Sequence, residues 1–137
     1  MISHILDTHT VIALIGGESD RLVSRVFDQP PGSIALSSIV VYELYFGAFK
    51  SARVAHNLET LRLLFEDFAI LDFDRNDAFA AGEIRAVLAA KGTPIGPCDV
   101  LIAGQAKARH LTVVTSNVGE FKRVDGLRVE DWLSSTP

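Results

Sequence analysis

Residues 2–17 read ISHILDTHTVIALIGG, and this stretch decides the class of fold. Its first apolar run stops at Asp7, which predicts a buried strand over residues 2–6. Its second run covers residues 10–15 and stops at Gly16, which predicts a short helix that ends at a pair of glycines. A strand that passes through one acid directly into a helix is typical of a layered α/β protein.

The rest of the chain repeats this alternation of short apolar strands and amphipathic helices. We expect further strands over residues 34–36, 69–71, 112–115 and 127–129. We expect helices over residues 19–28, 39–50, 53–66 and 76–90, and one from about Asp99 to Arg109. The pattern predicts an α/β fold with a mainly parallel central sheet flanked by helices. The expected inward residues of two helices are Leu22, Val23, Val26 and Phe27, and Ala80, Ile84, Val87 and Leu88.

The composition is that of a globular protein. The chain has 137 residues, of which 48% are hydrophobic and 22% charged, and we expect a single domain over residues 1–137. Cys98 is the single cysteine and no apolar run has the length of a membrane span, so we expect a cytoplasmic protein. The net charge of −4 opposes binding to nucleic acid, so such a role would need local basic residues, bound cations or a partner's charge.

Acidic and amide residues stand at the predicted ends of several elements. Asp7 follows the first strand and Asp99 begins a helix, so each is interpreted either as an N-cap or as part of a site. Glu43 lies inside an otherwise apolar helix, where a carboxylate is costly unless it is paired, protonated or bound to a cation. Asn117 follows the strand of residues 112–115. Ligands of parallel sheets collect beyond the carboxyl ends of the strands, so these residues form the candidate site.

The chemistry of such a site follows from its oxygen ligands. If the acids converge, their mutual repulsion favours a bound divalent cation. Oxygen ligands without a Cys/His cluster favour Mg²⁺, with Mn²⁺ as a substitute. The site then suits phosphodiester hydrolysis, because the cation activates water and neutralises the developing negative charge. The bound cation would also reverse the sign of the charge at the site.

Five blocks of sequence carry a family resemblance: Ile5–Thr8, Ser37–Leu44, Gly92–Ala103, Val114–Asn117 and Glu120–Trp132. With these blocks, in this order, the chain resembles a PIN-domain ribonuclease, specifically a VapC-type toxin of a type II toxin–antitoxin pair. The resemblance covers almost the whole chain. It implies a single PIN-like domain and an endoribonuclease that cleaves structured RNA, of the tRNA or rRNA class, with metal-activated water.

The resemblance also implies roles for residues and partners. It makes Asp7, Glu43 and Asp99 the ligands of Mg²⁺ or Mn²⁺ and places Asn117 where many relatives have a fourth catalytic acid. Thr8 and Thr115 become supporting hydroxyls. The implied partners are an RNA substrate and a VapB-like antitoxin. The toxin is expected to form a homodimer that joins the antitoxin in a hetero-oligomer, without a membrane.

Alternatives in other functional classes remain. A catalytically weak or inactive PIN-fold binding module would carry the same blocks. A phosphatase of the haloacid dehalogenase type has a signature similar to residues 7–11, but His9 stands in place of its second Asp. A response-regulator receiver domain needs a Lys after a late strand, where Ser116 and Asn117 stand.

Several other residues have two interpretations. Cys98 is interpreted as a small packing residue or as a nucleophile. The residues Lys50, Arg53 and Arg62 form either an RNA-facing patch or a solvated helix surface. The apolar helix over residues 42–49 is either part of the core or covered by another chain.

Overall fold

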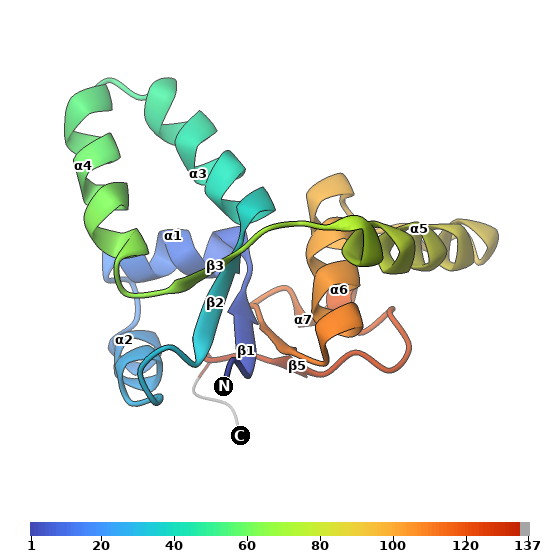
Figure 1. Ribbon diagram of the computed structural model, residues 1–137. Coiled ribbons are helices and arrows are strands. Elements are labelled where there is room, and N and C mark those ends of the chain that lie inside the picture. The colour runs from blue at the N-terminus through green and yellow to red at the C-terminus, as the bar shows by residue number, and fades with distance from the viewer. Residues whose placement is uncertain (135–137) are drawn as a thin grey trace.

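The computed structural model describes residues 1–134 and has a five-stranded sheet in the order β3-β2-β1-β4-β5 (Figure 1). Every pairing in this sheet is parallel, which confirms the predicted α/β class. The strands are β1 (His4–Leu6), β2 (Ile34–Ser37), β3 (Ala69–Leu71), β4 (Thr112–Val114) and β5 (Val129–Glu130). The last strand begins where the segment predicted for it ends, and residues 135–137 of the predicted domain lie outside the described residues.

The helices follow the strands in the predicted order. They are α1 (Thr8–Gly16), α2 (Asp20–Phe27), α3 (Ser38–Phe49), α4 (Val54–Phe65), α5 (Arg75–Ala90), α6 (Pro97–Arg109) and the short α7 (Val118–Phe121). Only α7 was not predicted, because four residues after a strand carry no periodic signal. Figure 1 shows the α3–α4 hairpin and the α5–α6 pair on opposite sides of the strands' carboxyl ends. In the described part of the chain, no helix combines the length and apolar character needed to cross a membrane.

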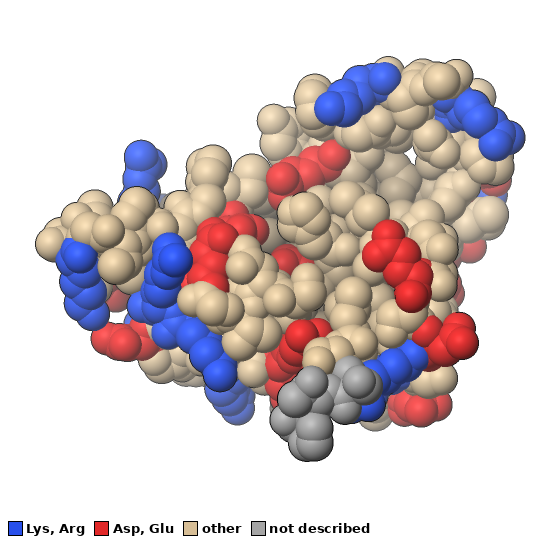
Figure 2. All heavy atoms as spheres, turned by 180° about the vertical axis from the view of Figure 1, so that it is seen from behind, with Lys and Arg blue, Asp and Glu red and all other residues tan. Residues whose placement is uncertain are grey.

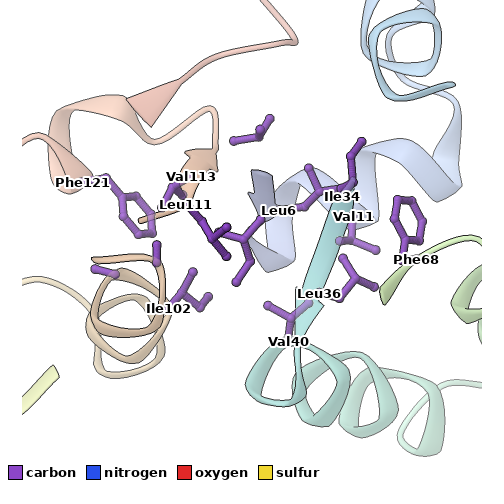
Figure 3. Close-up of a cluster of buried hydrophobic side chains, with 14 of the residues drawn as sticks. Leu6, Val11, Ile34, Leu36, Val40, Phe68, Ile102, Leu111, Val113 and Phe121 are labelled. Carbon is purple, nitrogen blue, oxygen red and sulfur yellow. The ribbon is translucent and has the colours of Figure 1, made fainter. Parts of the chain in front are cut away.

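The central strand β1 forms the middle of the core. Ile5 and Leu6 have no exposed surface, and neither do Val113 and Val114 on the neighbouring β4. Figure 3 shows Leu6 between the side chains of α6 and β4 on one side and those of β2 and α3 on the other. A parallel sheet buried on both faces needs continuous apolar strands, which explains why its short strands were recognisable in the sequence.

Two predicted helix faces are wrong in part. Phe27 and Val87 were expected to face inward, but their exposed fractions are 61% and 45%. In α5 the buried residues are Asp77, Ala81, Ile84 and Leu88, so the inward stripe includes a charged residue in place of Ala80 and Val87. An apolar pattern cannot reveal such a stripe, because the burial of Asp77 depends on a partner from another helix.

That partner is Arg109 at the end of α6. Its Nη2 lies 2.9 Å from Oδ2 of Asp77, and the Gln105 amide donates to the same oxygen at 3.0 Å. Burial opposes the charge of Asp77, but the bonds from Arg109 and from the backbone N–H of Asp74 outweigh it and lower the pKa of Asp77. The network joins α5 to α6.

The same two helices approach each other closely at Gly104 of α6. A Cβ atom built on Gly104 would lie 2.5 Å from Cβ and 2.6 Å from Cα of Ala81 in α5. This distance is far below a van der Waals contact, and the obstructing atoms include backbone. Glycine at position 104 therefore sets the separation of α5 and α6, and with it the position of the first turn of α6.

We expect Gly104→Ala to destabilise the protein, although alanine is the better helix former. Overpacking against Ala81 should lower the free energy of unfolding by about 1–3 kcal/mol. The matched control is Gly82→Ala in α5, where a Cβ would meet no atom within 4 Å. That change should raise the free energy of unfolding by about 0.5–1 kcal/mol. Urea denaturation measures both, and equal effects would contradict the close approach.

Candidate active site

Asp7 lies at the carboxyl end of β1 and is also the N-cap of α1. Its Oδ1 accepts a hydrogen bond from the backbone N–H of Thr10 at 2.9 Å. Its Oδ2 accepts one from the hydroxyl of Thr115, just beyond β4, at 2.5 Å. The residue is 1% exposed. The N-cap interpretation of Asp7 is thus confirmed, and it does not compete with a place in the site, because each oxygen has a different partner.

Glu43 occupies the second turn of α3 and faces the start of α1. The hydroxyl of Thr8 donates a hydrogen bond to Oε1 of Glu43 at 2.5 Å. Thr8 is the first residue of α1, directly after Asp7. The carboxylate inside an apolar helix is therefore half-buried and paired with a hydroxyl, and its partner ties it to the end of the central strand.

Asp99 lies in the first turn of α6, at its third residue. The N-cap of α6 is Gly96, and Pro97 occupies the first helical position, so the N-cap interpretation of Asp99 is wrong. The proline begins the helix two residues before the aspartate. The carboxylate of Asp99 therefore does not cap the N-terminus of α6. It contacts Glu120 instead.

Glu120 of α7 follows the same strand as Asn117 but was not among the predicted site residues. Its Oε1 accepts the backbone N–H of Gly96 at 2.6 Å, and its Oε2 accepts the side-chain amide of Asn117 at 2.5 Å. A Cβ at Gly96 would lie 3.4 Å from both Oε1 of Glu120 and Oδ2 of Asp99. Asn117, placed by the sequence at the fourth acidic position, thus donates to an acid one helical turn later. The sequence signal for placing Glu120 in the site was the presence of an acid three residues after Asn117.

Like charges in this cluster perturb one another. Burial, the hydrogen bond and charge of Glu120, and the charges of Asp7 and Glu43 raise the pKa of Asp99 to about 7. Burial also acts against ionised Glu120, but the bonds from Gly96, Asn117 and Asp99 outweigh it and lower the pKa of Glu120. The Asp99–Glu120 pair therefore keeps one proton up to about neutral pH and titrates as a unit.

The donor set fits a hard divalent cation, although the side chains are not closed around one. No three His, Cys, Asp or Glu side chains of residues 1–134 already form a cage for a metal ion. A bound divalent cation would relieve the repulsion that raises the pKa of Asp99. The available donors, on Asp7, Glu43, Asp99 and Glu120, are all carboxylate oxygens, which suit Mg²⁺ or Mn²⁺.

Of these carboxylates, Glu43 and Asp99 line a surface hollow of about 510 Å³. We call it the acidic hollow; it is lined by Thr8, His9, Ile12, Tyr42, Glu43, Phe46, Gly96, Pro97, Cys98 and Asp99. Within it, burial and the neighbouring carboxylates of Glu43 and Asp99 raise the pKa of the Cys98 thiol. A nucleophilic cysteine needs the opposite shift, so the structure favours Cys98 as a packing residue.

Comparison with known proteins gives one consistent result. The PIN domain family model matches residues 4–127. The chain is 42% identical over 132 residues to a protein of Salmonella typhimurium named tRNA(fMet)-specific endonuclease VapC, covering 96% of this chain and 99% of that one. It is 40% identical, with the same coverage, to a protein of that name from Shigella flexneri. A chain in the crystal structure of DNA-bound VapBC from Salmonella typhimurium superposes with a TM-score of 0.92 at 42% identity, covering 96% and 99% of the two chains.

We expect Asp99→Asn to stabilise the metal-free protein at alkaline pH and to have little effect at acidic pH. In the folded state the pKa of Asp99 is about 7, above its ordinary value of 3.8. The folded state therefore binds the proton more tightly, and stability is lost as the pH rises from about 4 to about 7. Asparagine carries no charge, so the variant should not lose this stability as the pH rises.

Thermal melting in EDTA at pH 4 and pH 8 measures the effect. The control is Asp67→Asn, at an exposed aspartate after α4, which should shift neither melting temperature by a comparable amount. A melting temperature of Asp99→Asn that falls below that of the wild type at pH 8 would contradict the repulsive cluster.

Proposed function

Because the chain belongs to the PIN-domain family and is a VapC-type ribonuclease toxin, we propose that it cleaves structured RNA at the acidic hollow with Mg²⁺, for which Mn²⁺ can substitute. The observation that carries this proposal is the meeting of Asp7, Glu43, Asp99 and Glu120 from separate elements, with a side-chain hydrogen bond between Asp99 and Glu120. The family match covers these residues and leaves no support for the phosphatase and receiver-domain alternatives.

The chemistry that a bound Mg²⁺ supplies is a more acidic attacking water and neutralisation of the charge that develops on the phosphate. The chain's own contribution is to hold the ligand oxygens in place. Thr115 and the Thr10 N–H orient Asp7, and Thr8 orients Glu43. Asn117 and the Gly96 N–H orient Glu120 beside Asp99. We assign Thr8, Thr115 and Asn117 to positioning and the four acids to binding the cation.

The RNA that we propose is tRNA, and initiator tRNA in particular. Two relatives at 42% and 40% identity, each covered over 99% of its length, are named as tRNA(fMet)-specific endonucleases. An rRNA substrate is the alternative within the same class of structured RNA. A surface hollow is suited to a loop nucleotide, because the bases of a loop can leave the stack and enter a concave site.

The partner that we propose is a VapB-like antitoxin, since the solved Salmonella relative is a VapBC complex. On this chain, α3 carries aromatic side chains on the surface: Tyr42, Tyr45, Phe46 and Phe49 are 65%, 40%, 59% and 64% exposed. Exposed aromatic residues at this density are typical of protein interfaces. We propose that the antitoxin covers this face of α3 and that the toxin itself forms a homodimer in the cytoplasm.

The nuclease proposal predicts metal-dependent cleavage. Purified protein should cleave tRNA(fMet) with Mg²⁺ or Mn²⁺ and lose this activity in EDTA. Asp7→Asn should abolish cleavage without lowering the melting temperature, because the asparagine oxygen can still cap α1. Asp99→Asn should also abolish it, and Asp67→Asn should cleave like the wild type. Gel assays of 5′-labelled RNA measure the rates. Full activity after chelation, or in Asp7→Asn, would refute the assignment.

The toxin proposal predicts growth arrest that the antitoxin relieves. Expression of the wild type alone should stop growth, and co-expression of the gene beside it should restore growth. Phe49→Glu should keep the toxicity but escape the antitoxin, because a charge replaces an exposed aromatic residue on α3. Phe79→Glu, on α5, is the matched control with 76% exposure and should be neutralised normally. A wild-type protein that is harmless at good yield would favour an inactive binding module.

A further inference from the structure

A second hollow lies directly beside the acidic hollow, on the other side of the loop before α6. It has a volume of about 290 Å³ and is bounded by α5, the loop of residues 94–97 and the first turn of α6. Pro97 lines both hollows. Asp99 is two residues from this shared proline. An extended ligand that lies across Pro97 would therefore contact both the acidic hollow and the second hollow. We call it the flanking hollow.

The floor and walls of the flanking hollow are apolar and rigid. Leu88 of α5 and Val100 of α6 form buried parts of it, with 2% and 5% exposure. Pro94, Ile95 and Pro97 supply the wall, and proline rings present fixed, flat surfaces. The volume is at the low end of the range for small-molecule sites, which suits one planar group rather than a folded segment.

The loop between the two hollows is held in place from outside. Arg123 donates from Nη1 to the carbonyl oxygen of Pro94 at 2.9 Å, and the Gly96 N–H donates to Glu120 at 2.6 Å. Both bonds come from α7 or the residues just after it. The wall of the flanking hollow is therefore anchored to the same acid that contacts Asp99, and the two hollows keep a constant separation.

The rim of the flanking hollow carries positive charge next to the acidic site. Arg85 of α5 lines the hollow and forms no ion pair within residues 1–134. By contrast, Arg62, one of the basic residues considered earlier for RNA, is held by Glu59 and Glu66. Figure 2 shows Lys and Arg side chains gathered over the side that carries α5–α7 and over the tip of the α3–α4 hairpin, with Asp and Glu side chains between them.

We propose that the flanking hollow binds the base of the nucleotide next to the scissile phosphate, and that Arg85 contacts a phosphate or stacks on the base at its rim. The occupant is a polyanion with planar apolar groups, which matches an apolar hollow with an unpaired guanidinium at its edge. This inference rests on the proposed nuclease function. It makes the flanking hollow a substrate-positioning site, distinct from the carboxylates that carry out the reaction.

The first test compares two arginines of the same helix. Arg85→Ala should raise KM for tRNA(fMet) about tenfold and change kcat less than about twofold, because it removes binding that is equal in the ground and transition states. The slope of log Kd against log salt concentration should decrease by about 0.7, as for one lost contact to single-stranded RNA. The control Arg75→Ala makes the same change of charge about 15 Å away along α5 and should alter neither quantity.

The second test removes the base instead of the protein group. A tRNA(fMet) with an abasic nucleotide on either side of the mapped cleavage site should bind the wild type about tenfold more weakly for one of the two positions. Ala89→Trp places an indole in the hollow from an exposed position on its lining. This variant should bind intact RNA as weakly as the wild type binds the abasic RNA, with no further loss for the abasic form. Binding is measured without added metal, so no cleavage occurs.

The outcomes separate this inference from the nuclease proposal. If the wild type cleaves no RNA with either metal, the nuclease function fails, and the flanking hollow as its substrate site fails with it. If the wild type cleaves but Arg85→Ala and Ala89→Trp match it in KM and binding, only the flanking hollow is overturned. If Ala89→Trp instead converts a dimer to a monomer in sedimentation, the hollow belongs to an interface between copies, and the RNA assignment is overturned.

Discussion

Repulsion between carboxylates held side by side is the constraint around which this protein is organised. Asp7 follows β1, and the other acids, Glu43, Asp99 and Glu120, lie in α3, α6 and α7. Each would be better solvated if it moved away from the others. They stay together because the apolar strands beneath them are fully buried and fix the elements that carry them. The free energy for this arrangement comes from the core, and the divalent cation that we propose at the site would relieve the repulsion.

The hydroxyl and amide groups around the acids fix each carboxylate in one orientation. Thr8, Thr115 and Asn117 each hold a single acid. None of these groups carries a charge, so they orient the carboxylates without neutralising them. Among the described residues, the ion pair of Asp77 with Arg109 lies at the opposite end of α6, where it anchors the helix away from Asp99. The acid of this ion pair and the acids of the proposed site thus lie at opposite ends of the α5–α6 pair.

A nuclease with a net charge of −4 meets a polyanionic substrate only if its charges are unevenly distributed. Glu43 and Asp99 line the acidic hollow, where the cation that we propose would offset their charge, while Arg85, which forms no ion pair within residues 1–134, lies at the rim of the flanking hollow. An exposed aromatic face on α3 borders the same hollow through Tyr42 and Phe46. Cover over that face would also restrict access to the site, which gives a physical route by which an antitoxin could silence the enzyme.

The sequence by itself determined the class of fold, because fully buried parallel strands must be continuously apolar and each is followed by a periodic helix. It also predicted one shared site for Asp7, Glu43 and Asp99, since a carboxylate in apolar surroundings needs a partner. Only the tertiary structure decided that Asp7 caps α1 while Asp99 caps nothing, and that Glu120 joins Asp99 while Asn117 supports it. It likewise placed Asp77 in the inward face of α5. These features depend on contacts between residues far apart in the chain, and local periodicity contains no information about which distant group will satisfy a buried charge.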